Sequence, residues 1–461
     1  MNVNRFRNIV LLLISSFALA SCGIVTDTYK KPDINEPLHY RDTESEDTTN
    51  LGSVSWKEMF KDKCLQDLIE EGLKNSPDLK TAVARIQQSE AAFGQSKLAL
   101  WPSLSTEISS TSKQKITNNS VSSSQNFELS LYSSWEADIW GKLTSAKRAN
   151  LAALLESKAN RDAVITTLIS GIAGQYYSLL ALDAQLDITR KTVDIRIADV
   201  NTMKVLEANA QVTGAAVVQS EASRYAAEVT LPDIQQSIRS VENSLSILLG
   251  KAPGAVKRST LTGQALPEKV QPGVPVQLLG NRPDVRKAEY AFRNAFELTN
   301  VARTYFYPSL TITASENTSA GKISELFNPM VILGNLVTGL TQPIFNQGIN
   351  TARLESAKAQ QEEALLNYKE TLLNATKEVS DALFSYQTAV LKSEVREKQI
   401  KALDQSVEYT KQLLAYGTAN YTEVLTAEQN LLSAELNRVN DKLQQLQACV
   451  SLYRSLGGGL K

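Results

Sequence analysis

The sequence predicts a mainly α-helical protein in which long helical hairpins alternate with two β-hairpins, and in which one plan occurs twice. Three observations predict this class. Short motifs from the first half of the chain recur in the second half at an offset of 206 or 207 residues, heptad spacing runs through long stretches without proline, and two segments alternate apolar and polar residues with a period of two. These features indicate two similar halves, long packed helices and paired strands, respectively.

The duplication is visible in short motifs. Pro77-Asp78-Leu79 returns as Pro283-Asp284-Val285, and Trp101-Pro102-Ser103-Leu104 returns as Tyr307-Pro308-Ser309-Leu310. Both matches have an offset of 206 in the numbering (283 minus 77; 308 minus 102). Leu249-Gly250 returns as Leu456-Gly457 at an offset of 207 (457 minus 250). Repeats of about 20–50 residues would indicate a solenoid, whereas one long duplication indicates two similar halves of a single body.

The elements predicted for each half follow in the same order. Helices cover Trp56 to Leu100 with a break at Pro77, and they precede the first β-hairpin. A helix from Lys142 to about Ala208 has apolar residues at seven-residue steps, and a second long helix returns to Leu249. In the second half the long helices are expected at about 349–416 and 422–456. The predicted organisation is a signal peptide at 1–21, a lipidated tether at 22–55, a first repeat at 56–250 with a β-hairpin at about 103–136, a linker at 251–281, and a second repeat at 282–461 with a β-hairpin at about 309–342.

The N-terminus has the layout of a secretory signal. Arg5 and Arg7 precede an apolar run that is followed by Leu19-Ala20-Ser21-Cys22. This ending resembles a bacterial lipobox, in which Cys22 is lipidated and becomes the first residue of the mature chain. The alternative is an ordinary signal peptide with an incidental cysteine. Gly23 stands where an aspartate would resemble an inner-membrane retention signal, so outer-membrane sorting is expected.

Composition argues against several classes of function. The 48 basic and 49 acidic residues are balanced, so no nucleic-acid footprint is present. With one histidine, His39, and no CxxC pair among Cys22, Cys64 and Cys449, no zinc or redox centre is encoded. Cys64 and Cys449 either form one disulfide or are two buried small hydrophobes. No catalytic signature occurs, so we expect no enzyme, no cofactor and no metal site.

The two alternating segments have one apolar and one polar face. In the first, Leu104, Thr106 and Ile108 alternate with Ser105, Glu107 and Ser109; on the return strand, Phe127, Leu129, Leu131 and Trp135 alternate with Glu128, Ser130 and Tyr132. A soluble, half-buried hairpin would have the same pattern. A transmembrane barrel strand differs only in that its apolar face meets lipid and its polar face meets a lumen.

Membrane geometry limits how such strands can be used. The chain after the signal has no uninterrupted apolar run of the length needed to cross a bilayer as a helix, about 18 residues or more, so no membrane-spanning helix is predicted. Any span must then be a closed barrel, because unpaired strand edges in hydrocarbon are costly. Four strands are predicted, whereas barrels of this kind need about eight or more. Two or three copies could close a barrel, with their helices stacked as a coiled-coil-like tube. The alternative is a trimeric outer-membrane lipoprotein scaffold without a transport role.

Several motifs together resemble one family. Arg282-Pro283-Asp284-Val285 with Ala288-Glu289 is similar to a signature of the TolC-like outer-membrane efflux family. The segments 135–141, 342–345 with Gly348, and 452–459 also look like that family. With the lipobox, the chain most resembles the lipoprotein branch, which is OprM- and CusC-like and is sometimes labelled NodT. The resemblance covers about Trp56 to the C-terminus.

The resemblance implies a fold and a function. It implies a homotrimer with four strands per chain in one 12-stranded outer-membrane barrel, and a helical tunnel that crosses the periplasm. It implies an exit duct of a tripartite efflux system, which passively conducts drugs or other small toxic solutes. Its partners would be a periplasmic adaptor, an inner-membrane pump and, through acylated Cys22, outer-membrane lipid. Four methionines and one histidine indicate no dedicated path for soft metals.

The resemblance also implies a constriction at the periplasmic tips, near the two turns between long helices. Residues assigned to the constriction are Thr202, Leu206, Tyr409, Leu413 and Tyr416. Residues assigned to adaptor contact are Ala210, Gln211, Val212, Thr213, Gly417, Thr418, Ala419 and Asn420. Arg282, Pro283, Asp284 and Glu289 are assigned a structural role in the family motif. Because no aspartate lies between 405 and 440, an apolar gate is expected. The alternatives are coiled-coil packing for the constriction residues and a plain small-residue turn for the tips.

Overall fold

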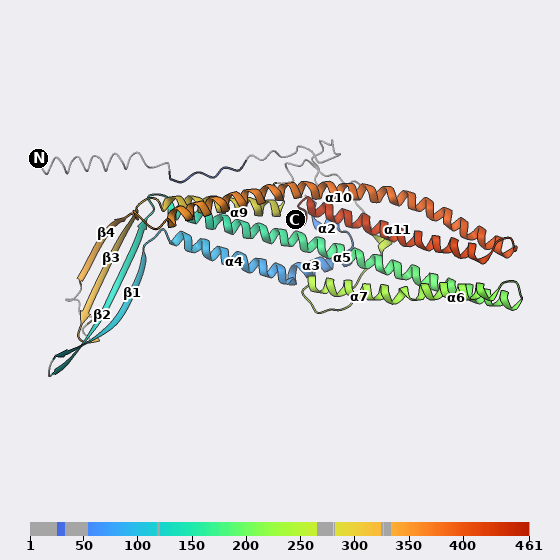
Figure 1. The fold of residues 1–461 in the computed structure, drawn as a ribbon, viewed down its shortest axis with the longest axis horizontal. Coiled ribbons are helices and arrows are strands. Elements are labelled where there is room, and N and C mark those ends of the chain that lie inside the picture. The colour runs from blue at the N-terminus through green and yellow to red at the C-terminus, as the bar shows by residue number, and fades with distance from the viewer. Residues whose placement is uncertain are drawn as a thin grey trace. The chain divides into compact units, whose positions relative to one another are not determined.

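The computed structural model describes residues 25–32, 54–117, 120–264, 280, 282–323, 326 and 333–460. The predicted signal peptide, Cys22 and most of the predicted tether and linker lie outside these residues. Figure 1 shows the order of the elements. They are α2 (Trp56–Met59), α3 (Lys63–Asn75), α4 (Pro77–Leu98), β1 (Ser103–Thr117), β2 (Ser120–Ala137), α5 (Lys142–Ala208), α6 (Gly214–Glu228), α7 (Thr230–Leu248), a 3₁₀ turn (Leu261–Gly263), α9 (Pro283–Thr304), β3 (Ser309–Ala320), β4 (Leu333–Thr341), α10 (Ile349–Ala415) and α11 (Tyr421–Ser455).

The internal duplication is confirmed in the lengths and starting points of the helices. Helices α4 and α9 each have 22 residues, and they begin at the equivalent prolines Pro77 and Pro283 of the repeated motif. Helices α5 and α10 each have 67 residues, and their first residues differ by an offset of 207 (349 minus 142). The 35-residue α11 corresponds to α6 and α7 together, because the same offset relates both their starts and their ends (421 minus 214; 455 minus 248).

One predicted helix is broken in the structure. The sequence predicts a single helix returning from the first turn to Leu249, but α6 ends at Glu228 and α7 begins at Thr230. Pro232 explains the break, because a proline has no backbone N–H and its ring clashes with the carbonyl four residues earlier, that of Glu228. The second repeat has no proline in α11, and that helix is continuous.

Glycines end the last helix of each repeat. Gly250 and Gly457 have φ angles of 68° and 77°, in the left-handed region that glycine adopts at low cost. At Gly250, a Cβ atom would lie 2.6 Å from the backbone carbonyl oxygen of Asn75, the last residue of α3. Glycine therefore allows the end of α7 to pack closely against the end of α3.

The chain forms two compact units, and each unit contains segments of both repeats. One unit comprises residues 1–34, 85–158 and 287–369, and the other comprises 35–84, 159–286 and 370–461. The first unit contains the strands and the second contains the tips of the long helices. The boundaries of these units do not coincide with those of the two sequence repeats. The boundaries predicted from sequence for the signal peptide, tether, repeats and linker stay predictions.

The four strands form one antiparallel sheet in the order β1-β2-β3-β4. Its register places Ile108 opposite Leu129, and Trp135 opposite Ile312. Because directly opposed residues share a face, the alternation predicted from sequence is confirmed. The apolar face contains Leu104, Ile108, Phe127, Leu129, Leu131, Trp135, Leu310, Ile312, Leu336 and Leu340; the polar face contains Ser105, Glu107, Glu128, Ser130, Tyr132, Thr313, Ser315 and Asn335.

Both outer strands of this sheet have an unpaired edge. Among the described residues, β1 pairs only with β2 and β4 pairs only with β3. Side chains on the apolar face are also open in the single chain, since the exposed fractions of Leu104, Ile108 and Leu336 are 71%, 71% and 74%. An apolar face with two open edges is unstable in either water or lipid unless other strands extend the sheet.

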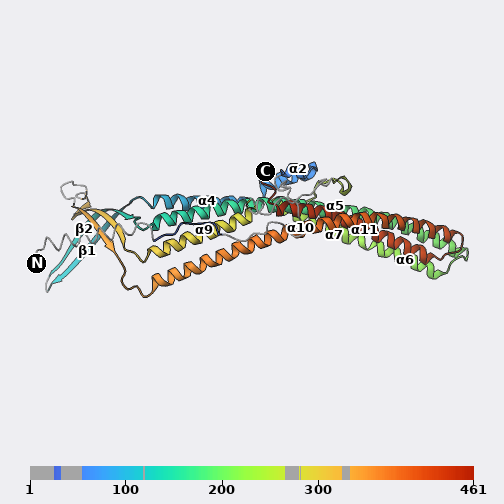
Figure 2. The same cartoon turned by 90° about the horizontal axis from the view of Figure 1, so that it is seen from above.

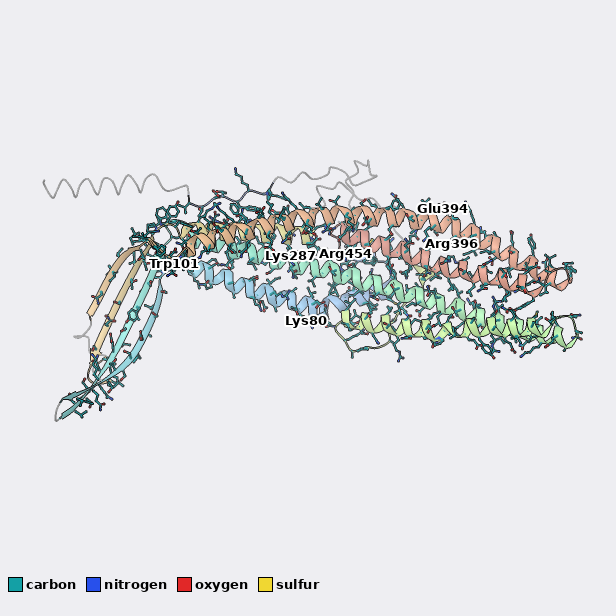
Figure 3. The ribbon with its side chains drawn as sticks, in the orientation of Figure 1. Lys80, Trp101, Lys287, Glu394, Arg396 and Arg454 are labelled. Carbon is teal, nitrogen blue, oxygen red and sulfur yellow. The ribbon has the colours of Figure 1, made fainter. Side chains whose placement is uncertain are left out.

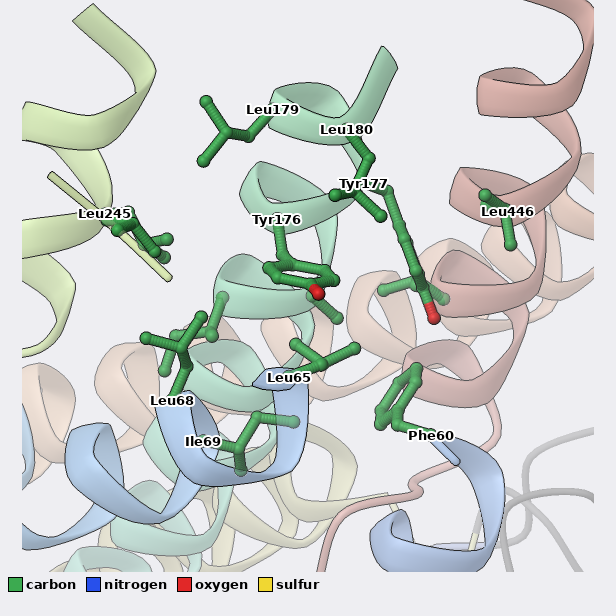
Figure 4. Packing of buried hydrophobic residues seen from close by; sticks show 14 of the residues in the cluster. Phe60, Leu65, Leu68, Ile69, Tyr176, Tyr177, Leu179, Leu180, Leu245 and Leu446 are labelled. Atoms are coloured by element: carbon green, nitrogen blue, oxygen red, sulfur yellow. The ribbon is translucent and has the colours of Figure 1, made fainter. Parts of the chain in front are cut away.

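The main core lies where α3, α5, α7 and α11 meet. Figure 4 shows Tyr176, Leu179 and Leu180 of α5 between residues of α3, α7 and α11. Cys64 and Cys449 are free thiols, and Cys64 is half-buried and packs against this core. Cys449 is buried, and its burial raises the pKa of its thiol to about 12. The two cysteines therefore form no disulfide, and of the two only Cys449 is the buried small hydrophobic residue expected by the second alternative.

Helix α5 is long and apolar enough to cross a membrane by length and composition alone. It is the one such helix among the described residues, with a mean hydropathy of 1.3 over an 18-residue window. Half of that window is buried inside the protein. Since α5 supplies much of the main core, packing against neighbouring helices accounts for its apolar character.

Candidate functional site at the helical hairpin tips

Two turns connect the long helices in the compact unit that contains 159–286 and 370–461. The first turn lies between the end of α5 at Ala208 and the start of α6 at Gly214; the second lies between Ala415 and Tyr421. Ala210 and Gly417 are equivalent by the offset of 207 (417 minus 210), and both have positive φ angles, 54° and 71°. The side chain of Asn420 accepts a hydrogen bond from Glu423 N (3.2 Å) and so caps α11.

The structure brings residues of the two turns together around one open groove of about 980 Å³. Of the residues predicted to contact an adaptor, Gln211, Val212, Thr213, Gly417, Ala419 and Asn420 line it, together with Leu206 and Tyr416 from the predicted constriction. Ala210 and Thr418 are exposed in the same turns but do not line the groove. Sequence alone could not show that the two turns share one groove.

The predicted constriction residues have two kinds of surroundings. Tyr409 and Leu413 lie four residues apart on α10, and Tyr416 follows its last residue, Ala415; the exposed fractions of the three side chains are 60%, 45% and 82%. Thr202 is also exposed. Leu206 is half-buried and packs against a small cluster formed by Met203, Val217, Tyr421 and Leu425. Leu206 therefore contributes to packing between the two hairpins in a single chain.

A cluster of four charged side chains near the turns was not predicted from the sequence. The Arg196 guanidinium of α5 donates to Glu428 of α11 and lies 3.4 Å from Asp199 Oδ2. Lys411 Nζ of α10 lies 2.7 Å from Glu428 Oε1. Arg196 and Glu428 are almost fully buried. The segment between 405 and 440 has no aspartate, so its acidic residue in this cluster is a glutamate, Glu428, and the partners of Glu428 include a residue of α5.

A sequence signal for this cluster does exist. Val193 and Val200 are seven positions apart on the packed face of α5, and Arg196 falls at the intervening position, where a coiled coil normally has an apolar residue. A charge at such a position requires an opposite charge from a facing helix. The four side chains carry two positive and two negative charges, so the cluster is balanced when all are ionised.

Asp199 is the member of the cluster whose pKa is raised. Burial, and then the nearby charge of Glu428, raise the pKa of Asp199 to about 6, while Arg196 and Lys411 act in the opposite direction. Beside the cluster, the hydroxyl groups of Ser220 and Tyr421 form a 3.0 Å hydrogen bond between α6 and α11. Burial also raises the pKa of Tyr421, so its hydroxyl stays protonated at neutral pH.

A second buried charge lies farther along the hairpin of α10 and α11, which are side by side in Figures 1 and 2. Arg396 Nε, labelled in Figure 3, donates to Asp441 Oδ2 at 2.8 Å, and Lys392 Nζ lies 3.0 Å from Asp441 Oδ1. Burial acts against ionisation of Asp441, but the bonds from Arg396 and Lys392 hold its pKa below the usual value. This ion pair stabilises the second hairpin alone, whereas the Arg196 cluster joins both hairpins.

The family-motif residues lie away from the tips. Arg282 is almost fully buried and donates to the backbone oxygen of Ser455 (2.8 Å), to Asp284 and to Glu378 (2.7 Å). Pro283 is the first residue of α9. Arg282 therefore joins the start of α9 to α10 and to the end of α11. Glu289 pairs with Lys31 at 3.5 Å.

The short N-terminal segment 25–32 lies against α9. Asp27 N donates to Asn300 Oδ1 (3.0 Å), Asn300 Nδ2 donates to the Asp27 carbonyl (2.9 Å), and Arg303 pairs with the Asp27 carboxylate. The ring of Tyr29 contacts those of Phe292 and Phe296. The chain is thus held on α9 from a point shortly after Cys22, which itself lies outside the described residues.

Comparison with known proteins identifies the family. The sequence model for the outer membrane efflux protein family matches residues 68–251 and 274–458, and the starts of these two ranges differ by the same offset as the repeated motifs (274 minus 68). The chain is 27% identical over 452 residues to the cation efflux system protein CusC of Escherichia coli strain K12, covering 96% of this chain and 98% of that one. It is 26% identical to the probable outer membrane lipoprotein SilC of Salmonella typhimurium, covering 98% and 99%.

Solved structures show the same fold. A crystal structure of CusC, at 25% identity, aligns with a TM-score of 0.86 and covers 94% of this chain and 99% of that one. The open state of the MtrE outer membrane channel of Neisseria gonorrhoeae, at 24% identity, aligns with a TM-score of 0.86 over 95% and 98%. The resemblance inferred from the motifs is confirmed: the chain belongs to the outer membrane efflux protein family.

Proposed function

We propose that this outer-membrane efflux channel is the exit duct of a tripartite system, which passively conducts small toxic solutes delivered by an adaptor and a pump. The observation that carries the proposal is the four-stranded sheet, with one apolar face, one polar face and two unpaired edges. A lipoprotein scaffold has no need for strands that suit lipid on one side and water on the other.

A homotrimer is the assembly that we propose. Three chains of four strands supply 12, which is enough to close a barrel and to pair both open edges of every sheet. The helices also have apolar residues that are exposed in the single chain: Val218, Tyr225, Val229 and Ile247 on α6 and α7 and around the break between them, and Leu373, Phe384, Leu391 and Val395 on α10. Contact with neighbouring chains would cover these residues.

The groove at the hairpin tips is the proposed adaptor site. It is open, it is lined by both turns of one chain, and its walls combine small residues with the polar groups of Gln211, Thr213 and Asn420. The small residues would allow the backbone of the adaptor to approach closely, and the polar groups would form a few hydrogen bonds with it. Both features suit a transient protein–protein interface. The inner-membrane pump would act through the adaptor.

Lipidation of Cys22 is the proposed anchor in the outer membrane. The lipobox-like sequence supports it, and residues 25–32, which follow Cys22 closely in the sequence, are hydrogen-bonded to α9. Mass spectrometry of the mature N-terminal peptide tests this proposal. An unmodified cysteine, or a mature chain that begins at another residue, would exclude the anchor.

The cargo is proposed by class only. Relatives are named for efflux of cations, toluene and antibiotics and for export of pyoverdine, so the family's cargo is diverse. Among the described residues, no group of three or more His, Cys, Asp or Glu could hold a metal ion. We infer a duct without a cofactor and without catalysis, whose specificity is set by its pump.

Replacing Leu413 by serine is expected to raise the conductance of the resting channel. Leu413 lies between Tyr409 and Tyr416 on an exposed face of α10, so a ring of these residues in a trimer would form an apolar barrier to water and ions. A hydroxyl at this position should favour wetting. Single-channel recordings in planar bilayers measure the effect, with Leu366→Ser, a change at another exposed leucine of α10, as the control. Equal conductance in the wild type and both variants would exclude Leu413 from the gate.

A further inference from the structure

The charge cluster near the tips joins the two hairpins of one chain, which are the two walls of the groove. Arg196 and Asp199 belong to α5 in the first hairpin; Lys411 and Glu428 belong to α10 and α11 in the second. The neighbouring Met203 cluster and the Ser220–Tyr421 hydrogen bond also join the hairpins, but neither contains a group that titrates near neutral pH. The charge cluster is therefore the one of these three contacts with a group that titrates near neutral pH.

We propose that the cluster is an acid-strengthened latch: a proton on Asp199 tightens the contact between the two hairpins and narrows the groove, whereas its loss loosens that contact. The proposal rests on the assignment of this groove to the adaptor, since it concerns regulation of the same site.

The geometry of the cluster supports a tighter contact in the protonated state. When Asp199 is ionised, it shares Arg196 with Glu428, and the two carboxylates repel each other across the α5–α11 contact. When Asp199 is protonated, the repulsion disappears and Arg196 forms its ion pair with Glu428 alone. The carboxylic acid of Asp199 then donates a hydrogen bond to Glu428. The charged or titratable groups that face Asp199 are Arg196 on its own helix, Lys411 on α10, and Glu428 and Tyr421 on α11.

The size of the effect follows from proton linkage. The packed state holds the pKa of Asp199 at about 6, whereas an Asp199 exposed by separated hairpins would return to the ordinary value of 3.8. The packed state thus binds the proton more tightly, so packing is favoured as the pH falls through about 6 and is weakened as it rises. Between about pH 7 and about pH 5, the ratio of packed to separated hairpins should increase about tenfold per chain.

Distance measurements between the tips test the latch in the full-length protein in lipid nanodiscs. Spin labels at Gln211→Cys and Thr418→Cys, in a Cys64→Ser, Cys449→Ala background, report the separation of the two turns by pulsed electron paramagnetic resonance. In the wild-type cluster, the share of the short distance should rise at about pH 5. Asp199→Asn, which resembles the protonated acid, should give the acid-type distribution at both pH values.

A matched control separates the latch from general effects of pH. Asp194 is an exposed aspartate on the same helix, so Asp194→Asn should respond to pH as the wild type does. A wild-type protein without a pH response, or an Asp199→Asn variant that retains it, would overturn the latch. Conductance measurements on the same samples test the exit-duct proposal separately from the latch proposal. A protein that conducts but shows no response loses only the latch, whereas one that never conducts loses the duct as well.

Discussion

Replacing Glu428 by glutamine should destabilise the packing of the two hairpins by about 3–5 kcal/mol, because the change leaves a buried guanidinium without its counter-charge. Arg196 is almost fully buried, and Glu428 is its closest carboxylate. Lys411 would lose the same partner, but its side chain is 44% exposed and can turn to water. Most of the cost should therefore come from Arg196.

Hydrogen exchange of the α5–α6 and α10–α11 segments measures this loss locally, since the tips can open without unfolding the whole chain. Glu397→Gln is the control. Glu397 pairs with Arg438 at 4.0 Å, and both side chains are about half exposed, so the change should cost less than about 1 kcal/mol. Equal protection in the two variants would mean that the buried cluster does not hold the hairpins together.

Replacing Ile108 by arginine should prevent most of the protein from reaching a stable state in the outer membrane. Ile108 lies on the apolar face of β1 and is 71% exposed in the single chain. An arginine facing lipid near the middle of a membrane costs about 2–4 kcal/mol. In a trimer this cost occurs three times, so the expected total is about 6–12 kcal/mol.

The matched control is the preceding residue. Glu107 is also exposed but lies on the polar face, so Glu107→Arg should leave assembly and membrane insertion nearly unchanged. The amount of heat-resistant oligomer in outer-membrane fractions measures both variants. If Ile108→Arg accumulated like the wild type, or if Glu107→Arg were the more damaging change, the assignment of lipid and lumen faces would be wrong.

The sequence predicted the fold well because its main signals are local and repeated. A period of two along β1 and β2 specifies which side chains share a face, and the register confirms it. Heptad spacing over α5, together with the matching motifs of the two halves, predicted one long helix in each half, and in the structure each has 67 residues. The prediction of one continuous helix from the first turn to Leu249 was wrong, because Pro232 clashes with the preceding turn and breaks the helix at Val229.

The candidate site depended more on contacts between segments distant in sequence. Arg196 and Glu428 are 232 residues apart, and neither residue alone predicts an ion pair. The groove likewise requires two turns from different halves of the chain to lie side by side. The attachment of residues 25–32 to α9 had no periodic signal, because a short extended segment makes its specific contacts through single side chains such as Asp27 and Tyr29.

The number of chains in the membrane-inserted particle decides whether the strands close a shared barrel. We expect native mass spectrometry of the protein, released from lipid nanodiscs, to give three chains, about three times the mass of the mature polypeptide. In such a particle both open sheet edges, on β1 and β4, are paired with neighbouring copies. A stable single chain in lipid would exclude the shared pore, because four strands cannot enclose one.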